Sequence, residues 1–315
     1  MNRKPAIISL SSIKLTQKEK KLLIQEKPWG VILFKRNIHT FNQTKKLIQE
    51  IRNCLKDKKY PILIDEEGGS VSRLSNLFST REYSQRFFGK IYENDNKNGI
   101  KLYKYYLETI SNILNDIGIN INTVPVLDLL QNLTHEIIKE RSYSKKLNTV
   151  KFLGKYCITF LKQKKIGSVG KHAPGHGCAN VDSHKKMPVV LKNKKHLLSS
   201  DFLAFKNLNC HFLMTAHVKY KKIDSRFPAT HSKKIIREII RKKLNYKGII
   251  ISDDISMKAL SKDLIFNAKQ ALFAGCNLVL HCNGNIQESR KLLSNLEKID
   301  AFTQKKTHQF YEFLR

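Results

Sequence analysis

The sequence lacks several features that would assign it to a common class. Its six cysteines show no C-x-x-C pair and no regular spacing, which argues against a zinc site and against a disulfide framework. No apolar run approaches the length of a membrane span, and the run over residues 6–10 is too short for the core of a signal peptide. We therefore expect a soluble protein of a reducing, cytoplasmic compartment with no membrane partner.

Acidic residues are scarce, with 26 Asp and Glu against 58 Lys and Arg, for a net charge of +32. Such a balance usually indicates binding to nucleic acid or to another anionic surface. The lysines, however, are spread along the whole chain, Ile and Asn are abundant with them, and no RNA- or DNA-binding motif accompanies them. We interpret the charge as compositional and predict no nucleic-acid partner.

The 315 residues, 41% of them hydrophobic, are enough to bury a substantial core. No Pro/Gly/Ser-rich linker or abrupt change of composition divides them, which predicts a single domain over 1–315 with a C-terminal helical tail at 301–315. Short apolar runs alternate with stretches of helical periodicity. The expected strands are 6–10, 31–34, 62–64, 119–126, 166–170, 212–216, 248–251 and 277–280. The expected helices are 16–26, 41–55, 103–114, 150–161, 197–205, 235–244, 264–274 and 286–296.

Alternating strands and helices predict parallel βαβ units, and about eight repeats favour a (β/α)8 barrel of the TIM type. A doubly wound sheet is the alternative, but it would need a Gly-rich phosphate turn after the first strand, which is missing. Distinctive polar residues follow the expected strands, and the C-terminal strand ends of a barrel form one face that carries the active site. These residues are Asp65, Asp128, Lys171, His172, His217, Asp253 and Asp254.

The segment 170–188, GKHAPGHGCANVDSHKKMP, gathers polar and titratable residues in a stretch too rich in Gly and Pro for a helix. We expect a loop after residue 170, on which Asp182 turns toward His184. A carboxylate there favours the imidazolium and fixes the ring, so His184 is a candidate proton carrier. Because no H-x-H or H-E-x-x-H spacing occurs and Lys171 opposes a cation, we predict no metal and no cofactor.

Two further segments place charged groups at expected strand ends. In 64–74, IDEEGGSVSRL, Asp65 and Arg73 could grip a hydroxylated substrate, or could form an acidic turn with a salt bridge. Arg141, by itself, is expected to be a surface residue. In 248–257, GIIISDDISM, a strand delivers two adjacent carboxylates, so that Asp253 could be a nucleophile or a metal ligand. His176 and His217 are expected to be structural or to contact substrate.

Together these segments resemble the family 3 glycoside hydrolases. The likeness rests on IDEEGGSVSRL, NTVPVLDL, ERS, KHAPGHG followed by DSH, MTAHV with PAT, and SDDISM, in order from about residue 31 to 282. The resemblance is greatest to the bacterial β-N-acetylhexosaminidases that act in cell-wall recycling, and it implies a link to cell-wall biogenesis, cell shape and cell division. The resemblance implies a (β/α)8 barrel and a retaining exo-β-N-acetylglucosaminidase acting on an amino sugar of peptidoglycan fragments (GlcNAc-1,6-anhydro-muropeptides).

The resemblance also implies roles for individual residues. Asp253 matches the nucleophile, and His184 with its partner Asp182 matches the general acid/base. The positions that match sugar-binding residues are Asp65, Arg73, Arg141, Lys171 and His172. The chain departs from the family pattern with Glu66 for Gln, Ser70 for Arg and Ala173 for Phe; the last predicts looser packing under the following loop and reduced activity.

Two other functions are compatible with these residues. A phosphorylase of β-N-acetylglucosaminides could use the same scaffold, because a His acid/base leaves room for an anionic phosphate nucleophile. A catalytically weak basic binding protein with a relict barrel is the non-enzymatic alternative, against which the intact Asp253, His184 and Asp182 argue. We expect a monomer.

Overall fold

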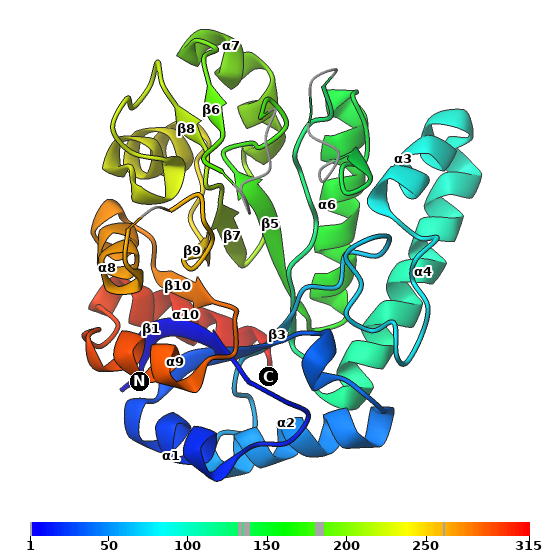
Figure 1. The fold of residues 1–315 in the computed structure, drawn as a ribbon. Coiled ribbons are helices and arrows are strands. Elements are labelled where there is room, and N and C mark those ends of the chain that lie inside the picture. Colours follow the sequence, from blue (N-terminus) through cyan, green and yellow to red (C-terminus); the bar gives the residue numbers. More distant parts are fainter. Residues whose placement is uncertain (1, 132–133, 135–138, 180–185, 261) are drawn as a thin grey trace.

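The computed structural model describes residues 2–131, 134, 139–179, 186–260 and 262–315. Eight parallel strands close into a barrel in the order β1-β10-β9-β7-β5-β4-β3-β2, and helices surround it (Figure 1). The barrel strands are β1 (Lys4–Ser9), β2 (Pro28–Leu33), β3 (Ile62–Ile64), β4 (Ile121–Asn122), β5 (Gly167–Ala173), β7 (Phe212–Thr215), β9 (Ile249–Asp254) and β10 (Leu278–His281). This topology confirms the predicted (β/α)8 barrel.

The helices cover the outside of this barrel. They are α1 (Gln17–Glu26), α2 (Phe41–Leu55), α3 (Gln85–Asn94), α4 (Asn96–Ile117), α6 (Leu147–Gln163), α7 (Lys194–Ser199), α8 (Leu264–Ala274), α9 (Ile286–Ser294) and α10 (Ala301–Phe313). A separate two-stranded parallel sheet pairs β6 (Val189–Val190) with β8 (Lys219–Tyr220). None of the helices that the structure describes is long and apolar enough to cross a membrane.

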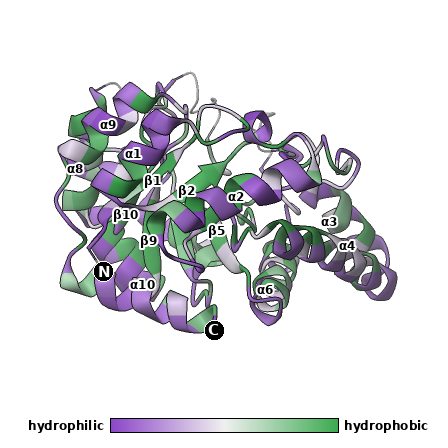
Figure 2. Ribbon diagram, turned by 90° about the horizontal axis from the view of Figure 1, so that it is seen from below, coloured by the Kyte–Doolittle hydropathy of each residue, from purple (hydrophilic) through white to green (hydrophobic). Residues whose placement is uncertain are grey.

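Helix α2 illustrates how the sequence forms these elements. Its N-cap Thr40 accepts a hydrogen bond from the N–H of Gln43, which satisfies one free donor of the first turn. Leu47, Ile48 and Ile51 then recur at helical spacing and are buried against the barrel. Figure 2 shows the same pattern for the whole molecule, with hydrophobic residues on the central strands and hydrophilic ones on the outer helices.

Helix α10 closes the N-terminal end of the barrel. Its Phe310 contacts Trp29 and Phe212, which lie at the starts of β2 and β7, with ring centroids 6.3 and 4.9 Å away. Gly167 at the start of β5 permits this approach, since a Cβ there would lie 2.7 Å from the Phe310 ring. The opposite end of the barrel, where the strands finish, carries the cavity described below.

The predicted strands agree in order with the observed ones but not in every bound. The strand expected over 119–126 is only two residues long, because the N–H of Val124 turns back to the carbonyl oxygen of Asn122 and Pro125 has no N–H to donate. The strand expected over 166–170 continues to Ala173, which pairs with Thr215. Lys171 and His172 therefore lie within β5, and the expectation that they follow its end was wrong.

The helix predictions were also correct in order and inexact in extent. The helix expected over 197–205 is α7 followed by a 3-10 segment, Asp201–Phe205, and the one expected over 235–244 is a π-helix, Ile235–Lys243. The helix expected over 103–114 is the central part of the longer α4. Helix α3 and the β6–β8 sheet were not predicted.

Candidate active site

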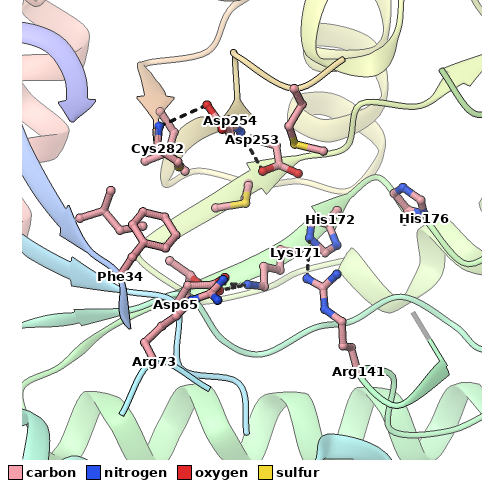
Figure 3. A pocket seen from close by; sticks show the side chains of 15 residues that line it. Phe34, Asp65, Arg73, Arg141, Lys171, His172, His176, Asp253, Asp254 and Cys282 are labelled. Atoms are coloured by element: carbon pink, nitrogen blue, oxygen red, sulfur yellow. Dashed lines mark hydrogen bonds and ion pairs between the residues drawn. The ribbon is translucent and has the colours of Figure 1, made fainter. Parts of the chain in front are cut away.

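A cavity of about 220 Å³ opens at the C-terminal ends of the barrel strands (Figure 3). The predicted site residues Asp65, Arg73, Arg141, Lys171, His172 and Asp253 all line it. The other two predicted site residues, Asp182 and His184, lie outside the described residues. The lining also has an apolar part, which includes Phe34, Met214, Met257 and Leu280.

Asp65 directly follows β3 and pairs with two positively charged side chains in the cavity. Its Oδ2 accepts a hydrogen bond from Arg73 at 2.9 Å, and its Oδ1 accepts from Lys171 Nζ and from the Thr123 hydroxyl, each at 2.5 Å. Burial alone would raise the pKa of Asp65, but the charges of Lys171 and Arg73 hold this pKa well below its usual range. Asp65 is therefore an ionised acceptor, suited to sugar hydroxyls.

Glu67 is a second carboxylate of this cluster, and its role was not predicted from the sequence. It accepts two hydrogen bonds from Arg141, from Nε at 2.7 Å and from Nη2 at 2.8 Å, and its Oε1 lies 2.5 Å from Lys171 Nζ. The Arg141 side chain is 8% exposed, so the expectation of a surface arginine was wrong. Burial lowers the pKa of Arg141, but Glu67 outweighs it and raises this pKa, so the guanidinium stays charged inside the protein.

His172 is held between Asp128 and Arg141. Its Nδ1 lies 2.7 Å from Asp128 Oδ2, and its Nε2 lies 3.2 Å from Arg141 Nη2. Because Arg141 can only donate, Nε2 accepts, and Nδ1 carries the proton that is donated to the carboxylate. Burial would raise the pKa of Asp128, but His172 and the hydrogen bond to it lower this pKa below its ordinary value.

Glu66 fixes the segment that carries Arg73. Its Oε2 accepts from the N–H groups of Arg73 at 2.6 Å and Leu74 at 2.9 Å, and its Oε1 accepts from the Thr80 hydroxyl at 2.7 Å. Burial raises the pKa of Glu66 despite these bonds. The Glu66 carboxylate thus uses both of its oxygens to shape the loop beside the cavity.

The two carboxylates at the end of β9 have different partners. The N–H of Asp254 donates to Asp253 Oδ1 at 2.7 Å, while the Asp254 carboxylate accepts from the Ser256 hydroxyl and from the N–H of Cys282. Figure 3 shows Asp253 turned into the cavity and Asp254 turned toward Cys282. Both residues line the cavity, and Asp253 is the one whose carboxylate points into it from the end of the strand.

His217 lies behind this strand end. Its Nε2 donates to the carbonyl oxygen of Asp254 at 2.9 Å, so Nδ1 accepts from the Thr230 hydroxyl at 2.7 Å. The ring is fully buried, and burial lowers its pKa. It acts as a structural support of β9, one of the two roles expected for it.

No group of three or more His, Cys, Asp or Glu side chains suited to a metal occurs among the residues that the structure describes. The cavity carries paired cations beside its carboxylates, and a lysine ammonium repels a metal ion. The absence of a metal stays a prediction.

Comparison with known proteins assigns the fold to a family. Residues 3–309 match the glycosyl hydrolase family 3 N terminal domain. The chain belongs to this family. It is a glycoside hydrolase, and its barrel, with acidic and basic groups at the strand ends, is the scaffold on which the family's sequence motifs meet.

Relatives of known name agree with this assignment. A beta-hexosaminidase of Haemophilus influenzae is 34% identical over 287 residues, which cover 88% of this chain and 79% of that protein. A beta-hexosaminidase of Thioalkalivibrio sulfidiphilus is 32% identical over 297 residues, or 93% of this chain and 84% of the relative. The structure of NagZ from Neisseria gonorrhoeae with N-trifluoroacetyl-D-glucosamine is 27% identical, with a TM-score of 0.85 over 100% of this chain and 91% of that chain.

Proposed function

We propose that this family 3 enzyme is a retaining exo-β-N-acetylglucosaminidase. The observation that carries the proposal is the meeting of Asp253 with the Asp65, Lys171 and Arg141 cluster in one cavity. The relatives called beta-hexosaminidases, and the N-trifluoroacetyl-D-glucosamine bound by NagZ, support an N-acetylated amino sugar as the ligand. The cluster offers both charged acceptors and charged donors, which a sugar ring with several hydroxyls requires.

In this proposal Asp253 attacks the anomeric carbon and forms a covalent glycosyl ester while the glycosidic bond breaks. His184, oriented by Asp182, gives its proton to the leaving oxygen and then takes a proton from the water that hydrolyses the ester. These two roles rest on the resemblance of the DSH motif. The sugar is held with its anomeric carbon facing Asp253. The residues that hold it are Asp65, Arg73, Arg141, Lys171 and His172.

The natural substrate that we propose is a GlcNAc-1,6-anhydro-muropeptide released during peptidoglycan recycling in the cytoplasm. The motif resemblance supports the substrate, and six free cysteines agree with a reducing compartment. We further propose that the enzyme works as a monomer without a cofactor.

The test is turnover of 4-nitrophenyl glycosides by the purified protein. We expect release of nitrophenol and GlcNAc from the β-N-acetylglucosaminide, and a much lower rate with the β-glucoside. Added phosphate should change neither rate nor product, whereas formation of GlcNAc-1-phosphate would assign the chain as a phosphorylase. Equal rates on the two glycosides would contradict the preference for an N-acetylated sugar.

A further inference from the structure

His176 has a firmly held backbone. Its N–H donates to Asp128 Oδ1 at 2.6 Å, the carbonyl of Gly175 accepts from the Tyr220 hydroxyl, and the carbonyl of Gly177 accepts from the Thr134 hydroxyl at 2.7 Å. The chain also passes so close to its neighbours that a Cβ on Gly177 would lie 1.8 Å from the carbonyl oxygen of Leu129. The main chain around His176 is therefore fixed on both sides.

The ring of His176, in contrast, has no hydrogen bond. The residue is 3% exposed, and within the part of the chain that the structure describes both of its ring nitrogens, Nδ1 and Nε2, are buried without a hydrogen-bond partner. A buried polar atom without a partner loses the free energy of its hydration, and structures rarely leave such a group unsatisfied. An unsatisfied ring on a rigid backbone therefore calls for a partner that is not part of the described chain.

The ring lies in the wall of the cavity that also contains Asp253. Figure 3 places His176 beside His172, on the side of the cavity opposite Phe34, and the two imidazole centroids are 5.9 Å apart. His172 has used both of its ring nitrogens, on Asp128 and Arg141. Among the described residues, His172 and His176 are the histidines that line the cavity, and His176 is the one whose ring nitrogens have no partner within the protein.

Burial lowers the pKa of His176 to about 4, so its ring is neutral at neutral pH. A neutral imidazole offers one N–H donor and one acceptor nitrogen. This pair complements an uncharged group that both donates and accepts, such as a hydroxyl or an acetamido group. Lys171, Arg73 and Arg141 can only donate, and Asp65 can only accept, so none of them supplies this pattern.

We propose that His176 is a further substrate-binding residue of this enzyme, whose ring donates one hydrogen bond to the amino sugar and accepts another from it. The inference rests on the proposed function, because it takes the ligand to be the sugar bound beside Asp253. His176 would add a neutral, two-way contact to a site that is otherwise built from charged groups.

The direct test is nuclear magnetic resonance of protein labelled with ¹⁵N at histidine, titrated with GlcNAc. The His176→Gln variant identifies the His176 signals by their loss. His231 is a matched internal control, because it is also buried, has a pKa lowered to about 4 by burial, lacks a partner on Nε2, and does not line the cavity. We expect GlcNAc to move both ring ¹⁵N signals of His176 and to leave those of His231 in place.

Kinetics provide a second readout. His176→Phe keeps an aromatic ring but removes both hydrogen bonds, and we expect kcat/KM to fall about 10- to 100-fold, as the loss of one or two neutral hydrogen bonds predicts. His176→Gln keeps a donor and an acceptor and should recover part of this loss, while His231→Gln should leave kcat/KM unchanged. If His176→Phe does not fold, the titration of the wild-type protein still decides the question.

The outcomes separate the two proposals. GlcNAc binding that leaves the His176 signals in place, or His176→Phe with wild-type kcat/KM, would overturn the role of His176 and leave the proposed function standing. A wild-type protein that neither binds GlcNAc nor cleaves its glycosides would refute the proposed function and this inference with it.

Discussion

Replacement of Glu67 by Gln tests the network of charges under the cavity. The side chains of Glu67, Lys171 and Arg141 are 1, 2 and 8% exposed, and Glu67 makes three contacts of 2.5 to 2.8 Å with the two cations. Removal of one partner from a buried ion pair costs about 3–5 kcal/mol, because the remaining charge is left without compensation. Lys171 keeps Asp65 as a partner, so we expect a loss near the lower end, about 3 kcal/mol.

Urea unfolding followed by tryptophan fluorescence measures this loss, since the chain has a single tryptophan, Trp29, which is fully buried in the barrel. The matched control is Glu108→Gln. Glu108 also pairs with a lysine, Lys164 at 2.9 Å, but its side chain is 42% exposed, and its replacement should change stability little. If Glu67→Gln unfolds with a free energy within about 1 kcal/mol of wild type, the buried pairs of Glu67 do not contribute the expected stability.

Three further changes have defined outcomes. The pKa of Asp65 is depressed in the folded state, so its contribution to stability is present above the unfolded pKa and is lost as pH falls through the folded pKa. The difference in unfolding free energy between wild type and Asp65→Asn should therefore stay constant from pH 7 to 5 and shrink in more acidic solution. A difference that grows at acidic pH would contradict the lowered pKa of Asp65. Gly177→Ala forces a Cβ against the carbonyl oxygen of Leu129 and should destabilise the fold by about 1–3 kcal/mol in the same urea assay, whereas the solvent-side Ser70→Ala should not. Dialysis against a chelator should leave the turnover rate unchanged, and a loss of activity restored by zinc would show that a metal takes part.

The barrel was predictable because its signals are local. Each strand is a short apolar run, each helix repeats apolar residues at helical spacing, and their alternation dictates parallel strands. Where the local signal is weak, the prediction was inexact. β4 ends early because the N–H of Val124 turns back to the Asn122 carbonyl, and the continuation of β5 to Ala173 depends on pairing with Thr215.

The charged network could be predicted only in part. Asp65 and Arg73 are eight residues apart, and a salt bridge between them was one of the two interpretations of this segment, beside contact with a substrate. The bonds between Glu67 and Arg141 join residues 74 positions apart. Arg141 was placed in the site only by the family resemblance of the ERS motif, since its local pattern alone predicts a surface arginine. The local signal for Glu67 was its position directly before Gly68 and Gly69, in the same segment as Asp65.

Mass spectrometry of the His184→Ala variant, after reaction with an activated aryl β-N-acetylglucosaminide, locates the covalent sugar. A good leaving group needs little protonation, so the glycosyl ester should form, and without the acid/base histidine its hydrolysis should be slow enough for the ester to accumulate. We expect one added N-acetylglucosaminyl group, on a peptide fragment in which it maps to Asp253. An added sugar on Asp254, or no covalent sugar while turnover continues, would contradict the role of Asp253 as the nucleophile.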